Sequence, residues 1–177
     1  ENYLRVSKKP TVSMLSVYLK ALVKAGRLSD SKDVYEKLKD IPKLPIDAYI
    51  NIAEYLEFDE KVIEANEFID KGLSVYANSV ELLLKKADLL LRTGDIKLYE
   101  KVLVKVEALK AEQCPTYYAL FLEHMGNASV LNGKSKLAAD FYRKSLKISE
   151  SSELRTRLAT LSVGGDKASQ ALIKESK

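Results

Sequence analysis

The feature that most limits how this chain can fold is the regular return of apolar residues, first along single helices and then at a longer period. Within residues 80–113, Leu83, Ala87 and Leu90 recur at the spacing of one helix face, and a second apolar series follows Gly94 at the same spacing. Glycine adopts the left-handed backbone that ends a helix, so a turn is expected at Gly94. Residues 80–113 therefore predict two antiparallel helices joined by a tight turn.

This two-helix unit of 34 residues is repeated along the chain. Units that start at Val12, Ile46 and Val80 hold large residues at positions 4, 11 and 24 and mostly smaller ones at positions 8, 20 and 27. A fourth unit fits if it starts at Ala119, five residues late, after a slip in the joint at 110–114. In order of these six positions, the units hold Leu15, Leu19, Leu22, Ser31, Tyr35 and Leu38; Tyr49, Ala53, Leu56, Ala65, Ile69 and Gly72; Leu83, Ala87, Leu90, Tyr99, Leu103 and Val106; and, in the fourth unit without position 11, Leu122, Gly126, Ala138, Tyr142 and Ser145.

This pattern resembles the tetratricopeptide repeat (TPR), a helix–turn–helix unit of the same length. Leu19 and Tyr99 are larger than that family's pattern allows, and no unit has its proline at position 32. The resemblance implies an all-α fold, a right-handed superhelical stack of antiparallel helix pairs (a TPR-like solenoid). It divides the chain into a linker or the end of a preceding helix at 1–10, about four repeats within 11–150 (12–45, 46–79, 80–113 and 119–152), and C-terminal capping helices at 151–177.

Helix ends can be placed from capping residues. Ser29 and Asp59 are expected to cap the second and fourth helices, since Ser and Asp side chains accept backbone N–H bonds at helix starts. Gly164-Gly165-Asp166 is expected to separate the last two helices. The predicted helices are 11–25, about 29–40, 46–58, 60–75, the two of 80–113, 115–131, 134–148, 151–163 and 167–175.

Composition narrows the class of protein. Apolar residues make up 46% of the chain and charged residues 31%, which is typical of a folded globular protein. The net charge of +4 is spread along the chain, so no polybasic tail indicates nucleic acid or a membrane surface. The sequence has no run of eighteen apolar residues, so it predicts no membrane span. With a single cysteine, Cys114, the cytoplasm is favoured over a bacterial periplasm, and a chain that starts with Glu1 favours a piece of a longer protein.

The sequence offers little for catalysis or metal binding. His124 is the only histidine, Cys114 cannot form a CxxC pair, and Gly164-Gly165-Asp166 lacks the Lys-Ser/Thr of a phosphate loop. His124 is therefore expected to be an ordinary surface or groove residue. We predict no enzyme activity, no cofactor and no metal.

If the resemblance holds, the first helix of each pair lines a concave groove. The groove would mix charged and amide side chains with apolar ones, which suits a peptide or helix of a partner protein. Its predicted partner-binding residues are Lys20, Ile50, Asn51, Glu54, Leu84, Lys85, Asp88, Arg92, His124 and Asn127. The carboxylate clamp of some TPR proteins is not expected, because its slots hold Ser16, Lys20, Asn51, Glu81 and Lys85, of which only Asn51 matches well.

A second resemblance leaves an alternative open. Residues 24–28 and 71–79 also resemble the pentatricopeptide repeat, an RNA-reading relative in which a polar side chain near position 5 reads a base. Ser16, Ile50 and Leu84 occupy that position here, and two of them are aliphatic. The predicted function is a protein–protein interaction scaffold or adaptor, part of a larger protein or complex, with an RNA-binding helical-repeat protein as the alternative. A regulatory domain of an enzyme and a homo-oligomer also stay open.

Overall fold

The fold is known from a computed structural model that describes residues 10–109 and 114–175, with side chains up to residue 163. Helices joined by short connections make up this described part of the chain. The linker predicted at 1–10, apart from Pro10, and residues 110–113 of the predicted joint lie outside the described residues. The helices are α2 (Val12–Lys24), α3 (Leu28–Leu38), α4 (Ile46–Phe58), α5 (Val62–Val75), α6 (Val80–Thr93), α7 (Ile96–Ala108), α8 (Pro115–Leu131), α9 (Ser135–Ile148) and α10 (Ser152–Glu175).

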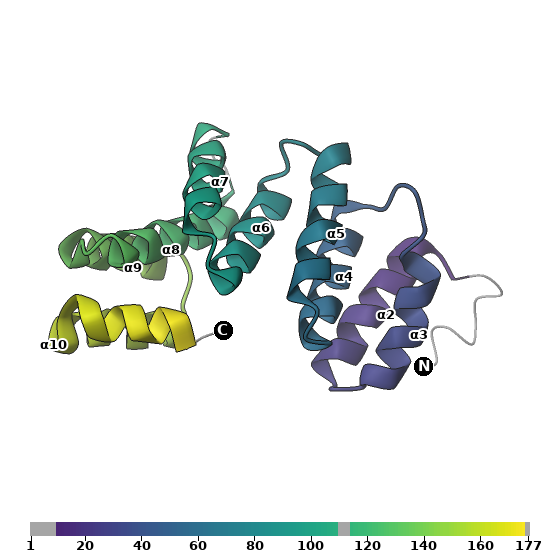
Figure 1. Cartoon of the computed structure of the whole chain (residues 1–177), viewed down its shortest axis with the longest axis horizontal. Coiled ribbons are helices and arrows are strands. Elements are labelled where there is room, and N and C mark those ends of the chain that lie inside the picture. The colour runs from purple at the N-terminus through teal and green to yellow at the C-terminus, as the bar shows by residue number, and fades with distance from the viewer. Residues whose placement is uncertain (1–9, 110–113, 176–177) are drawn as a thin grey trace. The chain divides into compact units, whose positions relative to one another are not determined.

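The chain forms two compact units, residues 1–85 and 86–177, with the boundary inside α6. In the N-terminal unit α2 packs against α3, α4 packs against α5, and α4 also lies against α2 (Figure 1). In the C-terminal unit α8 and α9 form an extensive helix pair, and α10 packs against both of them (Figure 1). The division of 11–150 into four repeats stays a prediction.

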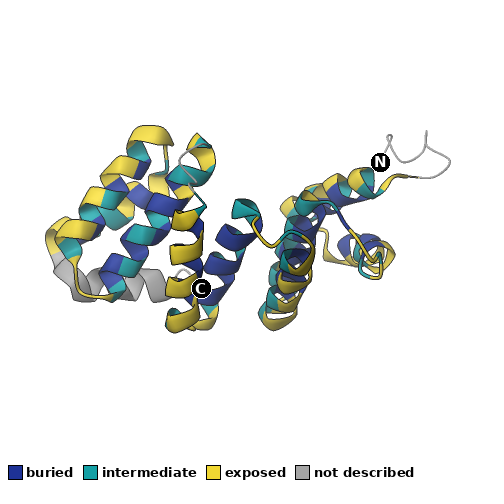
Figure 2. Cartoon of the chain, turned by 90° about the horizontal axis from the view of Figure 1, so that it is seen from above, coloured by how far each residue is buried: buried dark blue, intermediate teal, exposed yellow. Residues whose placement is uncertain are grey.

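The residues at the repeated positions form the interior of each unit. All of those named for the four units are buried, except Tyr35, which is half-buried. Figure 2 shows the same arrangement, with buried residues on the helix faces that meet and exposed residues outside. The period read from the sequence is thus a period of burial, as expected when helix faces pack on one another.

Two glycines are required by close packing. A Cβ atom on Gly72 would lie 2.9 Å from Cγ of Tyr49, and one on Gly126 would lie 2.2 Å from Cε1 of Tyr142. Both distances are shorter than carbon atoms tolerate without contact strain. Small residues at these positions let a tyrosine ring from a neighbouring helix fill the space.

Several helix ends follow the predicted capping. Gly94 has a φ of 80°, and the Asp95 carboxylate accepts a bond from the Leu98 N–H at 3.1 Å. The Ser79 hydroxyl accepts from the Leu82 N–H at 3.2 Å, and Pro115 stands in the first turn of α8. The predicted turn at Gly94 and the predicted start of a helix at residue 115 are confirmed, and the Asp95 and Ser79 side chains cap the helices that follow them.

Two predicted caps are wrong. The residue before α3 is Arg27 and the residue before α5 is Lys61, and neither makes a side-chain cap bond. Gly26 has a φ of 69° and forms the turn, and α3 then begins at Leu28, so Ser29 already lies within its first turn. Asp59 instead ends α4 and forms an ion pair with Lys61 at 2.6 Å.

The predicted break at Gly164-Gly165-Asp166 is also wrong, because α10 runs without interruption from Ser152 to Glu175. A glycine inside a helix costs about 1 kcal/mol relative to alanine, which lowers helix preference without ending the helix. Unlike proline, it keeps its N–H and does not collide with the preceding turn.

Candidate protein-interaction surfaces

The first helices of the N-terminal unit, α2 and α4, share a face that carries charged and apolar side chains. Lys20 on α2 and Glu54 on α4 approach to 3.8 Å (Nζ to Oε2), with 42% and 32% of their side chains exposed. Val17 lies three residues before Lys20, and Ile50 four residues before Glu54, so each pair shares one side of its helix. We call Val17, Lys20, Ile50 and Glu54 the first-helix face.

Apolar surface remains open on this face. Val17 is 61% exposed and Ile50 is half-buried. An exposed valine alone is ordinary on a protein surface. Here it stands beside a charged pair that spans two neighbouring helices, which gives the face both apolar contact area and charged groups of both signs.

Beneath this face, a buried amide joins the same two helices. Asn51 Nδ2 donates to the Ser16 hydroxyl at 2.8 Å and to the Ser16 backbone carbonyl at 3.3 Å, and both residues are buried. A buried amide needs such partners, because an unpaired one costs on the order of 1–3 kcal/mol. Asn51 thus holds α4 on α2.

A second ion pair of the unit is much less exposed. Lys85, at the start of α6, pairs with Glu57 of α4, and only 15% and 8% of their side chains are exposed. Lys85 was predicted as a partner-binding residue, and its ammonium group is already held inside the unit.

In the C-terminal unit, polar side chains of α7 and α8 meet in the interior. His124 on α8 is only 3% exposed, and its Nδ1 lies 3.2 Å from the Tyr99 hydroxyl of α7. That hydroxyl donates its hydrogen to the His124 backbone carbonyl at 2.8 Å, so the histidine must donate from Nδ1 to the tyrosine oxygen. This assigns the neutral ring with the proton on Nδ1.

The remaining ring nitrogen, Nε2, is buried with no hydrogen-bond partner among the described residues. Burial lowers the pKa of His124 to about 4, against a smaller opposite effect of Asp88. Burial also raises the pKa of the Tyr99 hydroxyl well above its usual value. Both groups are therefore neutral at pH 7, and neither is poised for acid–base chemistry.

A second set of hydrogen bonds joins α8 to α9 and α10 through Asn127. Its Oδ1 accepts bonds from the Tyr142 hydroxyl at 2.7 Å and from Arg157 Nη1 at 3.1 Å. Arg157, with 12% of its side chain exposed, also pairs with Glu123 at 3.0 Å and with Glu153 at 2.6 Å. The guanidinium of α10 thus closes a polar network over α8.

Glu123 shows how strongly this region is desolvated. Burial raises the pKa of its carboxyl group, while Arg157 lowers it and Glu153 and Asp88 raise it further. Arg157 does not fully offset the burial. The network is an internal support of the unit rather than a reactive site.

The structure brings together only part of the predicted groove set. Six of the ten residues are half-buried: Lys20, Ile50, Glu54, Lys85, Asp88 and Arg92. Four are buried: Asn51, Leu84, His124 and Asn127. The expected surface or groove position of His124 is wrong, because Tyr99 and the α8 interior cover it. Partner binding by the ten residues stays a prediction.

Sequence reasoning missed Tyr99, Tyr142 and Arg157 as members of a polar network. One signal was present, since Tyr99 is too large for the small position it occupies and a buried tyrosine hydroxyl needs a partner. Arg157 gave no signal, because a charged residue near the end of a repeat array is usually solvated.

Metal and membrane sites were searched in the described residues only. No group of three or more His, Cys, Asp or Glu side chains there could hold a metal ion. No helix there is both long and apolar enough to cross a membrane.

Comparison with known proteins identifies the class of fold. No protein-family model and no curated protein sequence matches the chain. Among solved structures, MamA MSR-1 matches with a TM-score of 0.60 and 16% identity over 94% of this chain and 98% of that one. MamA AMB-1 matches with a TM-score of 0.58 and 16% identity over 92% of this chain and 94% of that one.

MamA is a TPR-repeat protein. The chain therefore has an all-α, TPR-like fold, and the fold predicted from its sequence is confirmed. At this level of identity the likeness shows the fold alone.

Proposed function

We propose that this chain is a protein–protein interaction scaffold or adaptor without enzymatic activity, and that it works as part of a larger protein or complex. It binds a peptide or helix of a partner protein at the first-helix face of the N-terminal unit. The observation that carries this proposal is the exposed Val17 and half-buried Ile50 beside the Lys20–Glu54 pair. Such mixed surfaces on first helices suit an extended or helical segment, which supplies apolar side chains and satisfies charges at the rim.

The alternative, RNA binding, is less well supported by the same residues. Ser16 and Leu84, two of the three residues at the base-reading position, are buried. Lys20 faces Glu54, whose carboxylate repels a phosphate chain. These features favour a protein partner over a nucleic acid.

The proposal can be tested by photo-crosslinking in native extract. A photoreactive amino acid replaces Val17 in the full chain, and a matched chain carries it at Ile63, which is also exposed but lies on α5. We expect a discrete protein adduct from position 17, insensitive to RNase, and no such adduct from position 63. The substitution Ile50→Asp should then remove the adduct while circular dichroism stays unchanged.

Two results would contradict the proposal. RNA recovered at position 17, with no protein adduct after RNase treatment, would favour the RNA-binding alternative. Equal adducts from positions 17 and 63 would show that the first-helix face has no special role.

A further inference from the structure

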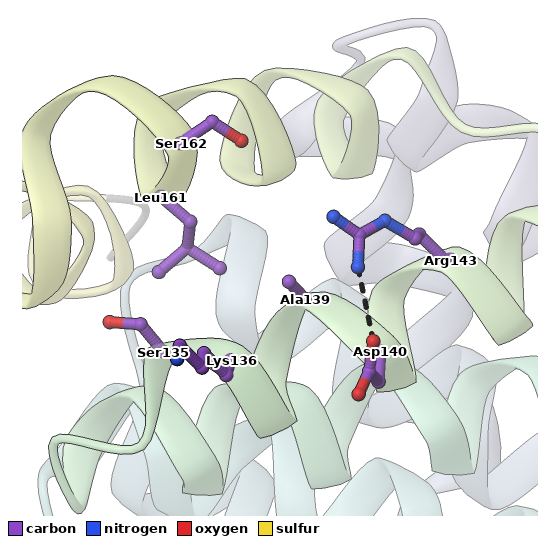
Figure 3. A pocket seen from close by; sticks show the side chains of 7 residues that line it. All are labelled: Ser135, Lys136, Ala139, Asp140, Arg143, Leu161 and Ser162. Carbon is purple, nitrogen blue, oxygen red and sulfur yellow. Dashed lines mark hydrogen bonds and ion pairs between the residues drawn. The ribbon is translucent and has the colours of Figure 1, made fainter.

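A groove runs between α9 and α10 of the C-terminal unit. It encloses about 400 Å³, and Figure 3 shows Leu161 of α10 pointing across it toward α9. Leu161 is buried and Ala139 half-buried, so the base of the groove is apolar. The rim is polar, and the lining residues are Ser135, Lys136, Ala139, Asp140, Arg143, Leu161 and Ser162.

The exposed side of α9 is strongly basic. From the residue before the helix to its end, five exposed residues are basic and one is acidic: Lys134, Lys136, Arg143, Lys144 and Lys147 against Asp140. Helix α5, the second helix of the pair before α6, is acidic on balance when counted in the same way, with Glu64, Glu67 and Asp70 against Lys61 and Lys71. The basic side of α9 is therefore not a general property of second helices in this chain.

Little within the described part of the chain neutralises this charge. Arg143 pairs with Asp140 at 3.0 Å, and both side chains are more than half exposed, so the pair contributes little. Lys136 and Lys147 form no ion pair with another described residue. Lys144 lies over the ring of Phe141 at 5.9 Å, which leaves its charge in place. The positive charge is available to a partner.

We propose that the α9–α10 groove binds an acidic amphipathic helix of a partner protein. A groove between two packed helices accepts a third helix along its length, and the partner's apolar side chains at i, i+3 and i+4 would reach Leu161 and Ala139. Acidic side chains on the flanks of that helix would meet Lys136 and Arg143. This surface lies in the other unit and shares no residue with the first-helix face.

The groove is less suited to a nucleic acid. Asp140 stands among its basic residues, and none of the seven lining residues is aromatic. Single-stranded nucleic acid usually needs aromatic side chains on which its bases stack, together with an uninterrupted basic track. An apolar base with charge on the rim fits a helix better.

The test uses the full chain and two synthetic helical peptides labelled with fluorescein. They share one leucine face, and their remaining positions carry glutamate in one peptide and lysine in the other. We expect fluorescence anisotropy to show that the glutamate peptide binds at least about tenfold more tightly. The double change Lys136→Glu with Arg143→Glu should weaken that binding by about tenfold or more.

A matched control reverses two exposed lysines of α3, Lys32→Glu with Lys37→Glu, which alters net charge equally on the other unit. It should change the affinity less than twofold, and circular dichroism should be the same for all three chains. Equal binding of both peptides, or equal effects of both double changes, would overturn the proposal. The proposal would also be overturned if an oligouridylate bound more tightly than the glutamate peptide and lost this binding on Lys136→Glu with Arg143→Glu. The groove would then be an RNA-binding site.

Discussion

Each unit links two of its helices through polar side chains, but the chemistry of the link differs. In the N-terminal unit, Asn51 reaches across to Ser16, 35 residues earlier, through neutral hydrogen bonds. In the C-terminal unit, Arg157 reaches across to Glu123, 34 residues earlier, through a charged pair. Both separations are close to the 34-residue period of the sequence, and the link is made by an amide in one unit and by a guanidinium in the other.

This difference decides which surface is available for binding. The neutral bond of Asn51 is buried, and the charged residues above it, Lys20 and Glu54, stay partly open to solvent. In the C-terminal unit the Arg157–Glu123 pair is less exposed, at 12% and 25% of its side chains, and Tyr99, His124 and Tyr142 are buried. The five exposed basic residues proposed to bind a partner in this unit lie instead on α9 or directly before it.

The largest expected effect comes from removing the charged junction. Arg157→Ala leaves Glu123 largely buried without its partner and removes one bond to Asn127. Breaking such a pair costs about 3–4 kcal/mol, because a desolvated charge is left uncompensated. We expect faster amide hydrogen exchange throughout α8 and α9 and unchanged exchange in α2 and α4. Because exchange is measured for each helix, it reports the stability of the two units separately. Unchanged exchange in α8 would show that the network contributes little to the unit.

Acidification should also distinguish the units, because His124 is the only histidine of the chain. Its pKa is about 4 in the folded protein and near 6.5 when unfolded, so the unfolded state takes up a proton first as pH falls. The stabilising contribution of the neutral ring is complete above pH 6.5. It declines between pH 6.5 and 4, by on the order of 3 kcal/mol in total.

The charged groups around His124 set the control for this measurement. Asp88 and Arg157 act on the ring, and the raised pKa of nearby Glu123 works in the opposite direction, since its protonation relieves a buried charge. The stability of α8, measured as its amide exchange rates relative to the intrinsic rates at each pH, should therefore depend less on pH in His124→Gln. If the stability of α8 still falls with pH in this variant, the carboxyl groups are the cause.

A smaller difference is expected between the two close-packed glycines. In Gly126→Ala the new Cβ would lie 2.2 Å from a Tyr142 ring carbon, and that ring is held by its bond to Asn127. We expect a loss of about 2–3 kcal/mol even after the gain in helix preference. Gly72→Ala meets Tyr49 at 2.9 Å and should cost about 1 kcal/mol or less. Thermal unfolding followed by circular dichroism would compare them, and equal midpoints would show that the Tyr142 ring can move aside.

Most of the fold could be predicted because burial in a repeat array follows a sequence period. Leu22, Leu56 and Leu90 recur every 34 residues, and all three are buried. The caps at Ser29 and Asp59 failed because a turn can be closed by a residue with positive φ, such as Gly26 or Glu60, without any side-chain bond. Local sequence does not decide between these two ways of ending a helix.

The candidate sites were harder to predict for a different physical reason. Whether a polar residue on a first helix faces solvent depends on what the next helix places over it. Asn127 was predicted in an open groove and is covered, because α10 brings Arg157 to its carbonyl oxygen. That partner lies 30 residues away, beyond the reach of any pattern within one helix.

The smallest expected effect is on the open pair of the first-helix face. Lys20→Ala removes an ion pair of 3.8 Å between side chains that are both about a third or more exposed, so its cost in stability should be below about 0.5 kcal/mol. A double-mutant cycle with Glu54→Ala should give a similarly small coupling energy, against several times more for Arg157 and Glu123. If the Lys20–Glu54 coupling proved as large, the pair would be an internal support like that of the C-terminal unit. The first-helix face would then have no charges to offer a partner, and the proposed binding there would have to rest on Val17 and Ile50 alone.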